Sequence, residues 1–230
     1  QPIRKPYKGF KYTSSRINTK GLRDFSFPSE ITICFKVPSG IGFWPAFWML
    51  QEDGCWPLSG EIDIMEQWGS DLPTNQTTGA AHVGYECGAN NTYQSWNTTI
   101  DGSFADDFHV YSVIWYEDYI GWYLDDELQY FITPSSYSDN LYWPFNEGDW
   151  YIMINFAIDN GGPNSNTVFP SNIEVDYVRV YQTQDIQGCM DNNATNYNDQ
   201  ATLDDNSCIY EVTFNVNMNC SDENPETVYV

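Results

Sequence analysis

The chain has 230 residues, which allows one large domain or one domain with a small appendage. Its 32 acidic and 9 basic side chains give a formal net charge of −23. This charge argues against nucleic acids and anionic membranes as partners, because both need basic surfaces, and it favours neutral over strongly anionic ligands.

Several features predict a soluble protein that acts outside the cell. The sequence has no run of 18 or more apolar residues and no signal peptide at Gln1, so we expect a processed or trimmed chain without a membrane span. Six cysteines and five Asn-X-Ser/Thr sequons fit a secreted protein. Three of the sequons lie in a stretch that we expect to be loop-like. The sequons begin at Asn75, Asn90, Asn97, Asn193 and Asn219.

The first predicted strands precede residue 51. Residues 12–17 and 30–38 alternate apolar and polar side chains, and residues 44–50 form a continuous apolar run typical of a strand inside a sandwich. Trp44 and Trp48 are four residues apart in that run, so they can share a face. We expect at least one of them to form the floor of a cleft, with the cleft and the core as equal alternatives for the other.

The stretch GEIDIME places three carboxyl groups in what otherwise reads as a buried strand. Side chains alternate between the two faces of a strand, so Glu61 and Asp63 point the same way. Glu66 is five positions from Glu61 and would point to the opposite face of a regular strand. One extra residue, a β-bulge at Ile64 or Met65, brings all three acids onto one face.

Three acids in one cleft repel one another, so at least one is expected to stay protonated near neutral pH. Glycoside hydrolysis with retention needs this asymmetry, because one carboxylate acts as nucleophile and the other as general acid and then base. From the residues alone, a calcium site with oxygen ligands and a solvated acidic edge remain alternatives.

A loop and a second strand flank the acidic strand. Residues 51–60 predict the loop, and residues 77–85 predict the neighbouring strand. We expect a disulfide between Cys55 and Cys87 to join this loop to that strand, although cysteine spacing alone does not determine the pairing.

Alternating strands continue as far as residue 182, with turns at residues 118–119 and 125–126. Asn155 is polar within an apolar strand, so it needs a hydrogen-bond partner if it is buried. A sugar hydroxyl or a catalytic acid is the partner that we expect. These strands are predicted at residues 108–118, 120–132, 150–160 and 171–182.

The segments WPAFWML and GEIDIMEQWG together resemble the signature of glycoside hydrolase family 16, and the resemblance extends from residue 12 to residue 182. It implies an all-β fold, a jelly-roll β-sandwich of two curved antiparallel sheets with the acids in a concave substrate cleft. It also makes Glu61 the nucleophile, Glu66 the general acid/base and Asp63 the group that tunes their protonation. The spacing of the acids resembles that in the laminarinase and agarase branch.

The same resemblance implies supporting roles for other residues. Arg16 would hold substrate, and Trp115 would stack near the reactive sugar. His82 would lie beside Glu66 and change its proton affinity. Asp176 would bind a structural calcium ion on the convex face. A surface charge for Arg16 and a structural role for His82 remain the alternatives.

Family members carry strands before residue 12 that this sequence does not match. We therefore expect that the chain is a fragment, or that another chain or an altered topology completes the sandwich. We expect the sandwich to span residues 1–184.

Beyond the sandwich, residues 185–210 form an acidic appendage with too few apolar residues for a core of its own. It resembles thrombospondin type 3 calcium repeats, and a flexible acidic linker is the alternative. Residues 211–230 begin a further β module, so more modules or neighbouring chains are expected. The resemblance implies a Cys189–Cys208 disulfide and calcium ligands among Asp191, Asn193, Asp199, Asp204 and Asp205.

The expected function is endo-acting, retaining hydrolysis of a neutral β-linked polysaccharide, best a β-1,3-glucan, without a catalytic cofactor. Transglycosylation would use the same residues. The alternative from another class is a structural or carbohydrate-binding component of an extracellular assembly that reuses the hydrolase fold.

Overall fold

The computed structural model divides the chain into two compact units, residues 1–183 and 184–230. Most of the further β module expected at residues 211–230, including the sequon at Asn219, lies outside the described residues. For residues 2–7 and 10 only the backbone is described. The described residues are 2–7, 10–69, 73–138, 141–159, 161–182 and 187–211.

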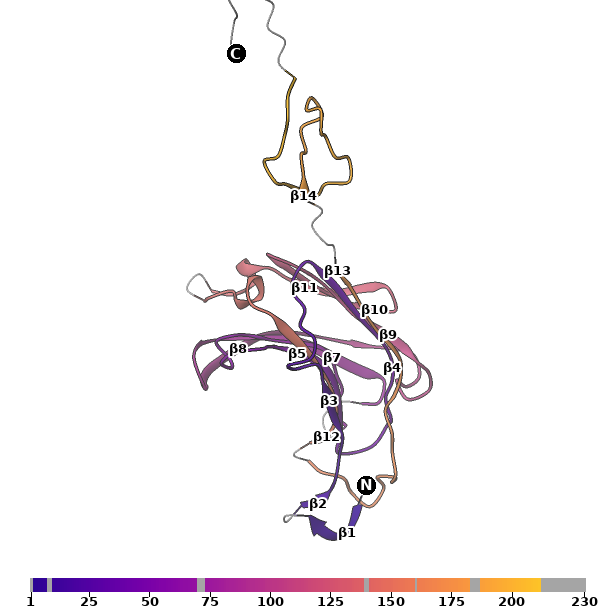
Figure 1. The fold of residues 1–230 in the computed structure, drawn as a ribbon. Helices are drawn as coiled ribbons and strands as arrows, with labels where there is room; N and C mark the ends of the chain where they lie inside the picture. Colours follow the sequence, from indigo (N-terminus) through magenta and orange to yellow (C-terminus); the bar gives the residue numbers. More distant parts are fainter. Residues whose placement is uncertain are drawn as a thin grey trace, which may run out of the picture. The chain divides into compact units, whose positions relative to one another are not determined.

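The first unit is a sandwich of two antiparallel sheets, drawn as two layers in Figure 1. One sheet has six strands in the order β3-β12-β5-β6-β7-β8, and the other has five in the order β11-β10-β9-β4-β13. The six strands are β3 (Arg16–Asn18), β12 (Trp150–Ile158), β5 (Phe43–Gln51), β6 (Glu61–Glu66), β7 (Gln76–Glu86) and β8 (Ala89–Thr99). The five are β11 (Glu127–Ile132), β10 (Tyr119–Leu124), β9 (His109–Tyr116), β4 (Ser29–Lys36) and β13 (Glu174–Gln182).

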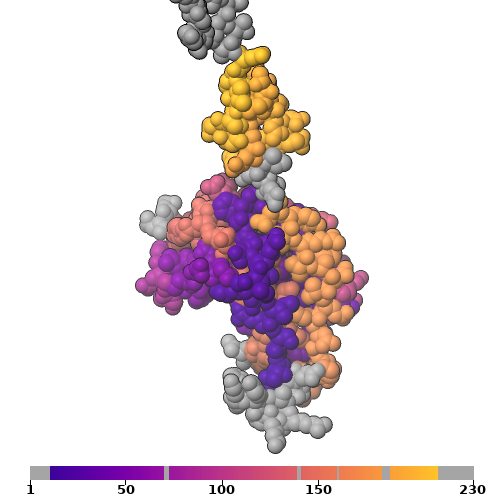
Figure 2. Space-filling model, viewed as in Figure 1, coloured from indigo at the N-terminus to yellow at the C-terminus, as the bar shows by residue number. Residues whose placement is uncertain are grey.

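Strands from distant parts of the sequence pair within each sheet. β13, near the end of the unit, pairs with β4, and β12 lies between β3 and β5. Figure 2 shows the resulting contact of early, indigo residues with late, orange residues on the surface. A short hairpin of β1 (Pro2–Tyr7) and β2 (Phe10–Tyr12) precedes the sandwich. The predicted all-β, jelly-roll class is confirmed.

Helical structure is sparse in the part of the chain that is described. It is limited to two 3-10 turns, η1 (Pro134–Ser136) and η2 (Pro144–Asn146). Within the same residues no helix has the length and apolar character needed to cross a bilayer.

The core between the two sheets is rich in aromatic side chains. Trp115, Trp122 and Trp150 are fully buried there. Trp115 lies on β9 in the five-stranded sheet, and its Nε1 donates to the carbonyl of Phe145 at 2.8 Å. The prediction that Trp115 stacks on the reactive sugar is therefore wrong, because its strand belongs to the other sheet and its ring has no exposed surface.

The stretch that carries the first three sequons is not loop-like. Asn75 precedes β7, whereas Asn90 and Asn97 lie on β8, an eleven-residue strand. Asn90 and Asn97 are exposed, while the Nδ2 group of Asn75 donates to the carbonyl of Ile100 at 3.1 Å. Glycosylation at these sites stays a prediction.

The second unit is a small loop structure closed by a Cys189–Cys208 disulfide with an S–S distance of 2.03 Å. β14 (Gln187–Gly188) and β15 (Leu203–Asp204) pair in parallel. In residues 187–211 no three acidic side chains gather as a cation site would require. Asp191 instead accepts from Tyr210 and Asn193, and Asp205 from the backbone N–H of Ser207.

Asp176, the predicted calcium ligand of the sandwich, is exposed on β13 at the edge of the five-stranded sheet. It lies at a register irregularity between Val175 and Tyr177. Among the described residues it belongs to no group of three potential ligands. Calcium binding at Asp176 stays a prediction.

Candidate active site

A β-bulge in β6 brings the three acids onto one face, as the sequence predicts. Met65 pairs with Phe47 and Asp63 with Trp48, so Ile64 has no partner on β5. Ile64 and Met65 are both buried in the core, which means that two consecutive side chains point inward. Glu66 then returns to the outward face.

The back of the bulged strand is held by the core. The indole Nε1 of Trp122 donates to the carbonyl of Asp63 at 2.9 Å. Gly60 enters the strand with φ of +79°, and a Cβ at this position would come within 3.0 Å of the rings of Phe145 and Trp150. Both contacts favour one placement of the acids, because neither the backbone turn nor the indole can shift without disturbing the core.

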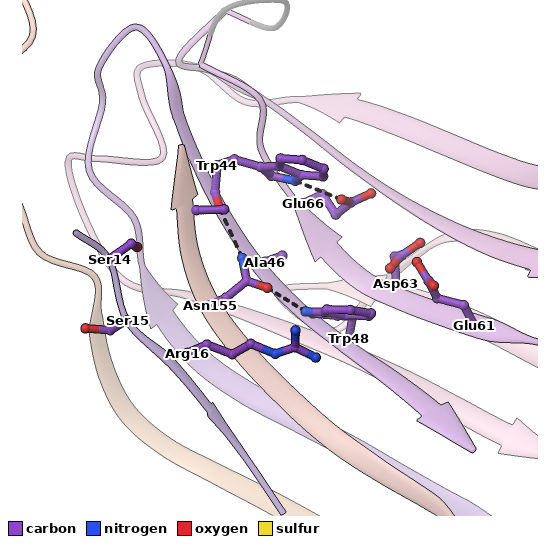
Figure 3. A pocket seen from close by; sticks show the side chains of 11 residues that line it. Ser14, Ser15, Arg16, Trp44, Ala46, Trp48, Glu61, Asp63, Glu66 and Asn155 are labelled. Carbon is purple, nitrogen blue, oxygen red and sulfur yellow. Dashed lines mark hydrogen bonds between the residues drawn. The ribbon is translucent and has the colours of Figure 1, made fainter. Parts of the chain in front are cut away.

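The acids lie along one side of a pocket of about 410 Å³ on the face of the six-stranded sheet that is turned away from the core. Figure 3 shows their carboxyl groups facing side chains from β3, β5 and β12 across this space. The pocket is lined by Ser14, Ser15, Arg16, Trp44, Ala46, Trp48, Glu61, Asp63, Glu66, Asn155 and Ala157.

Glu66 is oriented by two tryptophans. The Nε1 groups of Trp44 and Trp68 donate to the same oxygen, Oε1, at 2.9 and 3.2 Å. Burial raises the pKa of Glu66, and the two indole donors oppose this rise. Because Oε1 already accepts two N–H groups, a proton on Glu66 must reside on Oε2. Glu66 therefore has one anchored oxygen, Oε1, and its Oε2 is the oxygen that can carry a proton and donate it.

Glu61 and Asp63 act as a coupled pair. Burial, followed by the charge of Asp63 and a hydrogen bond with it, raises the pKa of Glu61 to about 8. Burial and the charge of Glu66 raise the pKa of Asp63 as well, and Asp63 is only 3% exposed. Without substrate, the two carboxyls share a proton near neutral pH.

His82 lies opposite Glu61 on β7, whereas Thr78 is the residue opposite Glu66. The Nε2 atom of His82 is 3.1 Å from Oδ2 of Asp63, although the two atoms are not aligned for a hydrogen bond. The strand register thus places His82 opposite Glu61 and not opposite Glu66. The predicted effect on proton affinity is confirmed, because the charge of His82 lowers the pKa of Glu66. Potential ligand atoms of Glu61, Asp63 and His82 lie within 4.8 Å of one another, so these groups could also hold a cation.

The side of the pocket that lies opposite the acids is lined by Asn155, Trp48 and Arg16 (Figure 3). The side-chain oxygen of Asn155 accepts from Trp48 Nε1 at 2.7 Å, and its Nδ2 donates to the carbonyl of Trp44 at 3.3 Å. The Arg16 guanidinium lies 5.2 Å from the ring centre of Trp48 and donates to the Met153 sulfur. Asn155 is hydrogen-bonded, as its position predicts, but its partners are tryptophans rather than an acid (Figure 3).

The structure therefore groups Arg16, Trp44, Trp48 and Asn155 with the acids and leaves Trp115 outside. Trp44 and Trp48 both line the pocket, and neither belongs to the core. Trp68, which also donates to Glu66, was not predicted as a site residue from the sequence. Alternation could have found it, because Trp68 is two positions after Glu66 and so shares its face.

Sequence comparison identifies the protein family of this chain. The model for "Glycosyl hydrolases family 16" matches residues 6–179. The chain belongs to this family. The family 16 region is 37% identical over 193 residues to glucan endo-1,3-beta-glucosidase A1 of Niallia circulans, a match that covers 78% of the chain and 28% of the relative. It is 32% identical over 190 residues to the beta-glucanase of Rhodothermus marinus, covering 77% of the chain and 65% of the relative.

A solved structure agrees with these relatives. The endo-beta-1,3-glucanase of Pyrococcus furiosus superposes with a TM-score of 0.69 at 36% identity, covering 78% of this chain and 71% of that one. The chain thus spans less than two thirds of the length of both curated relatives.

Proposed function

We propose that this protein is an endo-acting, retaining hydrolase of neutral β-1,3-glucans. One observation carries the proposal: Glu61 and Glu66 lie in one row on a bulged strand, at an open pocket lined by tryptophans. The net charge of −23 disfavours anionic polysaccharides. Both curated relatives are named as glucan-cleaving enzymes, which supports the substrate class.

The reaction proceeds in two steps. Glu61 attacks the anomeric carbon while Glu66 gives its Oε2 proton to the glycosidic oxygen, so the C–O bond to the leaving sugar breaks as the bond to Glu61 forms. Glu66, now a carboxylate, takes a proton from water as the water oxygen attacks the same carbon and displaces Glu61. Two displacements restore the β configuration, and no cofactor takes part.

Asp63 allows Glu61 to act as an anion. A nucleophile with a pKa of about 8 would be protonated at neutral pH. Because the two carboxyls share a proton, Asp63 can keep that proton while Glu61 carries the charge. The carboxylate of Glu61 then faces the anomeric carbon, and Asp63 stays neutral behind it.

Hydrolysis of laminarin is expected to be about tenfold or more faster than that of agarose, with mixed-linkage glucan between them. Release of reducing sugar measures the rate, and NMR of the first product reports its anomeric form before mutarotation. A β product is expected because the mechanism inverts the carbon twice. A first product in the α form, or a folded protein inactive on all three polymers, would refute the proposal.

We also propose that the protein works outside the cell. The disulfides Cys55–Cys87 and Cys189–Cys208 support this location, since such bonds persist in oxidising compartments. The exposed sequons at Asn90 and Asn97 are consistent with it.

We further propose that the acidic appendage binds calcium as a thrombospondin type 3-like repeat that links this region to further modules. The Asp-rich composition and the disulfide that closes the loop support this. Saturating calcium is expected to protect residues 187–211 from limited proteolysis, with a stabilisation of about 2 to 3 kcal/mol. Magnesium is the control, and equal digestion in calcium and in chelator would contradict the proposal.

A further inference from the structure

The five-stranded sheet carries exposed aromatic rings on its outer face, which is turned away from the core. In each of four strands, a residue next to the aromatic one packs in or against the core, so alternation turns the aromatic side chain outward. Tyr116, Phe131 and Tyr181 expose 52%, 53% and 53% of their surfaces. We call the four residues the outer aromatic track. They are Tyr116 on β9, Tyr119 on β10, Phe131 on β11 and Tyr181 on β13.

Strand pairing joins the rings of the track across the sheet. Tyr116 is opposite Tyr119, and their ring centres are 6.4 Å apart. Tyr119 stacks on Phe131 with ring centres 5.7 Å apart and ring planes at 19°. Opposed residues share a face, and a row of them crosses all five strands, a span of about 19 Å at 4.8 Å per neighbouring strand. The row consists of Phe131, Gly121, Ile114, Glu30 and Tyr181.

A pocket of about 230 Å³ hollows the track between Tyr116 and Tyr181. β4 lies between the strands of these two tyrosines, and its Glu30 lines the pocket. Glu30 Oε1 accepts from the Thr32 hydroxyl at 3.4 Å, and a carboxylate has further acceptor capacity for a ligand hydroxyl. Two aromatic rings that flank a hydrogen-bonding carboxylate offer both the stacking surface and the polar contact that orient a sugar ring.

The ring of Tyr119 is held in place before any ligand binds. Gly121 lies between Tyr119 and Tyr123 on the same face of β10, and a Cβ at Gly121 would come within 2.4 Å of the Tyr119 hydroxyl. The space of the missing side chain is therefore occupied by the phenol. Burial, followed by a hydrogen bond with Tyr123, raises the pKa of Tyr119 to about 12. A ring that is positioned in advance lowers the entropic cost of binding.

The area of the track fits a narrow ligand better than a second protein. An aromatic side chain presents about 200 Å² in all, so four rings that are up to half exposed offer at most roughly 400 Å². A standard protein interface buries about 800 Å² on each partner. The chain has a net charge of −23 and the pocket holds a carboxylate, which disfavours an anionic ligand. A narrow, neutral polymer meets both conditions.

We propose that the outer aromatic track is a second binding site for the neutral glucan that the proposed hydrolase cleaves. The inference rests on the proposed function, because the ligand is the same polymer. The track lies on the five-stranded sheet and the acids lie on the six-stranded sheet, so a glucan chain on the track does not contact the reacting groups. While the track holds one chain of a glucan particle, the cleft meets neighbouring chains at a high effective concentration.

The first test measures binding to insoluble β-1,3-glucan particles, with Glu61→Gln as the parent so that the polymer stays uncut. Adding Tyr116→Ala and Tyr181→Ala together is expected to raise the dissociation constant about tenfold or more. Adding Gly121→Ala instead keeps every ring but displaces the Tyr119 phenol, and a rise of about threefold or more is expected.

The matched control is Tyr177→Ala. Tyr177 lies on the same strand and the same face as Tyr181, but four residues away from it and outside the pocket. Its variant is expected to bind the particles within about twofold of the parent. Melting temperatures of all variants check that the surface substitutions leave the fold intact.

The second test restores Glu61 and measures cleavage. The Tyr116→Ala/Tyr181→Ala variant is expected to lose about fivefold or more of its rate on dilute glucan particles. Its kcat/KM on a short soluble laminarin oligosaccharide is expected to stay within about twofold of the wild type, because the track is on the other sheet.

The outcomes separate this inference from the proposed function. An active wild type whose Tyr116→Ala/Tyr181→Ala variant binds particles equally well, or loses as much on the short oligosaccharide as on particles, would overturn the second site and leave the hydrolase intact. A wild-type dimer in sedimentation velocity that this variant dissociates would assign the track to a second copy and also overturn the inference. A wild type that cleaves no glucan would overturn the hydrolase, while weaker particle binding by the variant would still support the second site.

Discussion

Replacing Glu61 with alanine is expected to lower hydrolysis on the order of 10⁴-fold or more, because no group remains to form the glycosyl intermediate. The variant leaves space on the side of the sugar from which Glu61 attacks. Azide that enters this space is expected to attack an activated aryl β-glucan oligosaccharide directly, with a single inversion. The product is then the α-glycosyl azide, which NMR distinguishes from the β form.

The matched variant is Glu66→Ala. It retains the nucleophile, so an activated aryl substrate still forms the glycosyl intermediate without an acid. Azide then attacks that intermediate from the opposite side and yields the β-glycosyl azide. Opposite anomers from the two variants would establish both roles. The same anomer from both, or an α-azide from Glu66→Ala, would show that the roles of Glu61 and Glu66 are assigned wrongly.

The acid row could be predicted from the sequence because its geometry is local. The positions of Glu61, Asp63 and Glu66 along a strand determine their faces once a single bulge is allowed. The bulge itself could also be anticipated, since three acids with this spacing fit one face in no regular strand. The sequence did not determine whether Ile64 or Met65 is the extra residue of the bulge, because this depends on how the two residues pair with β5.

The predictions that were wrong concern contacts between strands that are distant in sequence. Trp115 alternates correctly along its strand, but alternation cannot tell which of two sheets a strand joins. The position of the His82 side chain relative to Glu66 depends in the same way on the register between β6 and β7. Residues 89–99 read as a loop because Asn and Thr dominate them, yet pairing with β7 makes them a strand.

Trp56 illustrates a third limit. Trp56 belongs to a loop, and loops carry no periodic pattern from which a facing direction could be read. Its position depends on the disulfide to Cys87 and on packing against Gly84, both of which act across more than 25 residues. The contact of Trp56 with His82 becomes visible only when the fold brings this loop beside β7.

Glu61→Gln is expected to stabilise the fold above neutral pH. The folded protein raises the pKa of Glu61 from 4.5 to about 8, so it holds a proton that the unfolded chain releases between these values. The stability due to this proton is complete below about pH 4.5 and is lost as the pH rises through 8. Each unit of pKa corresponds to about 1.4 kcal/mol, so the cost to the folded wild type is several kcal/mol at pH 9.

Thermal unfolding at pH 4.5 and at pH 9 measures this effect. The melting temperatures of wild type and Glu61→Gln are expected to agree within about 2 °C at pH 4.5, where Glu61 is neutral in the folded protein, and to differ by roughly 10 to 20 °C at pH 9 in favour of the variant. Glu127→Gln is the control, because Glu127 is exposed at the start of β11 and should follow the wild type. If Glu61→Gln ran parallel to the wild type across this range, Glu61 would not be held protonated by its surroundings. Asp63 would then not be needed to keep the proton away from the nucleophile.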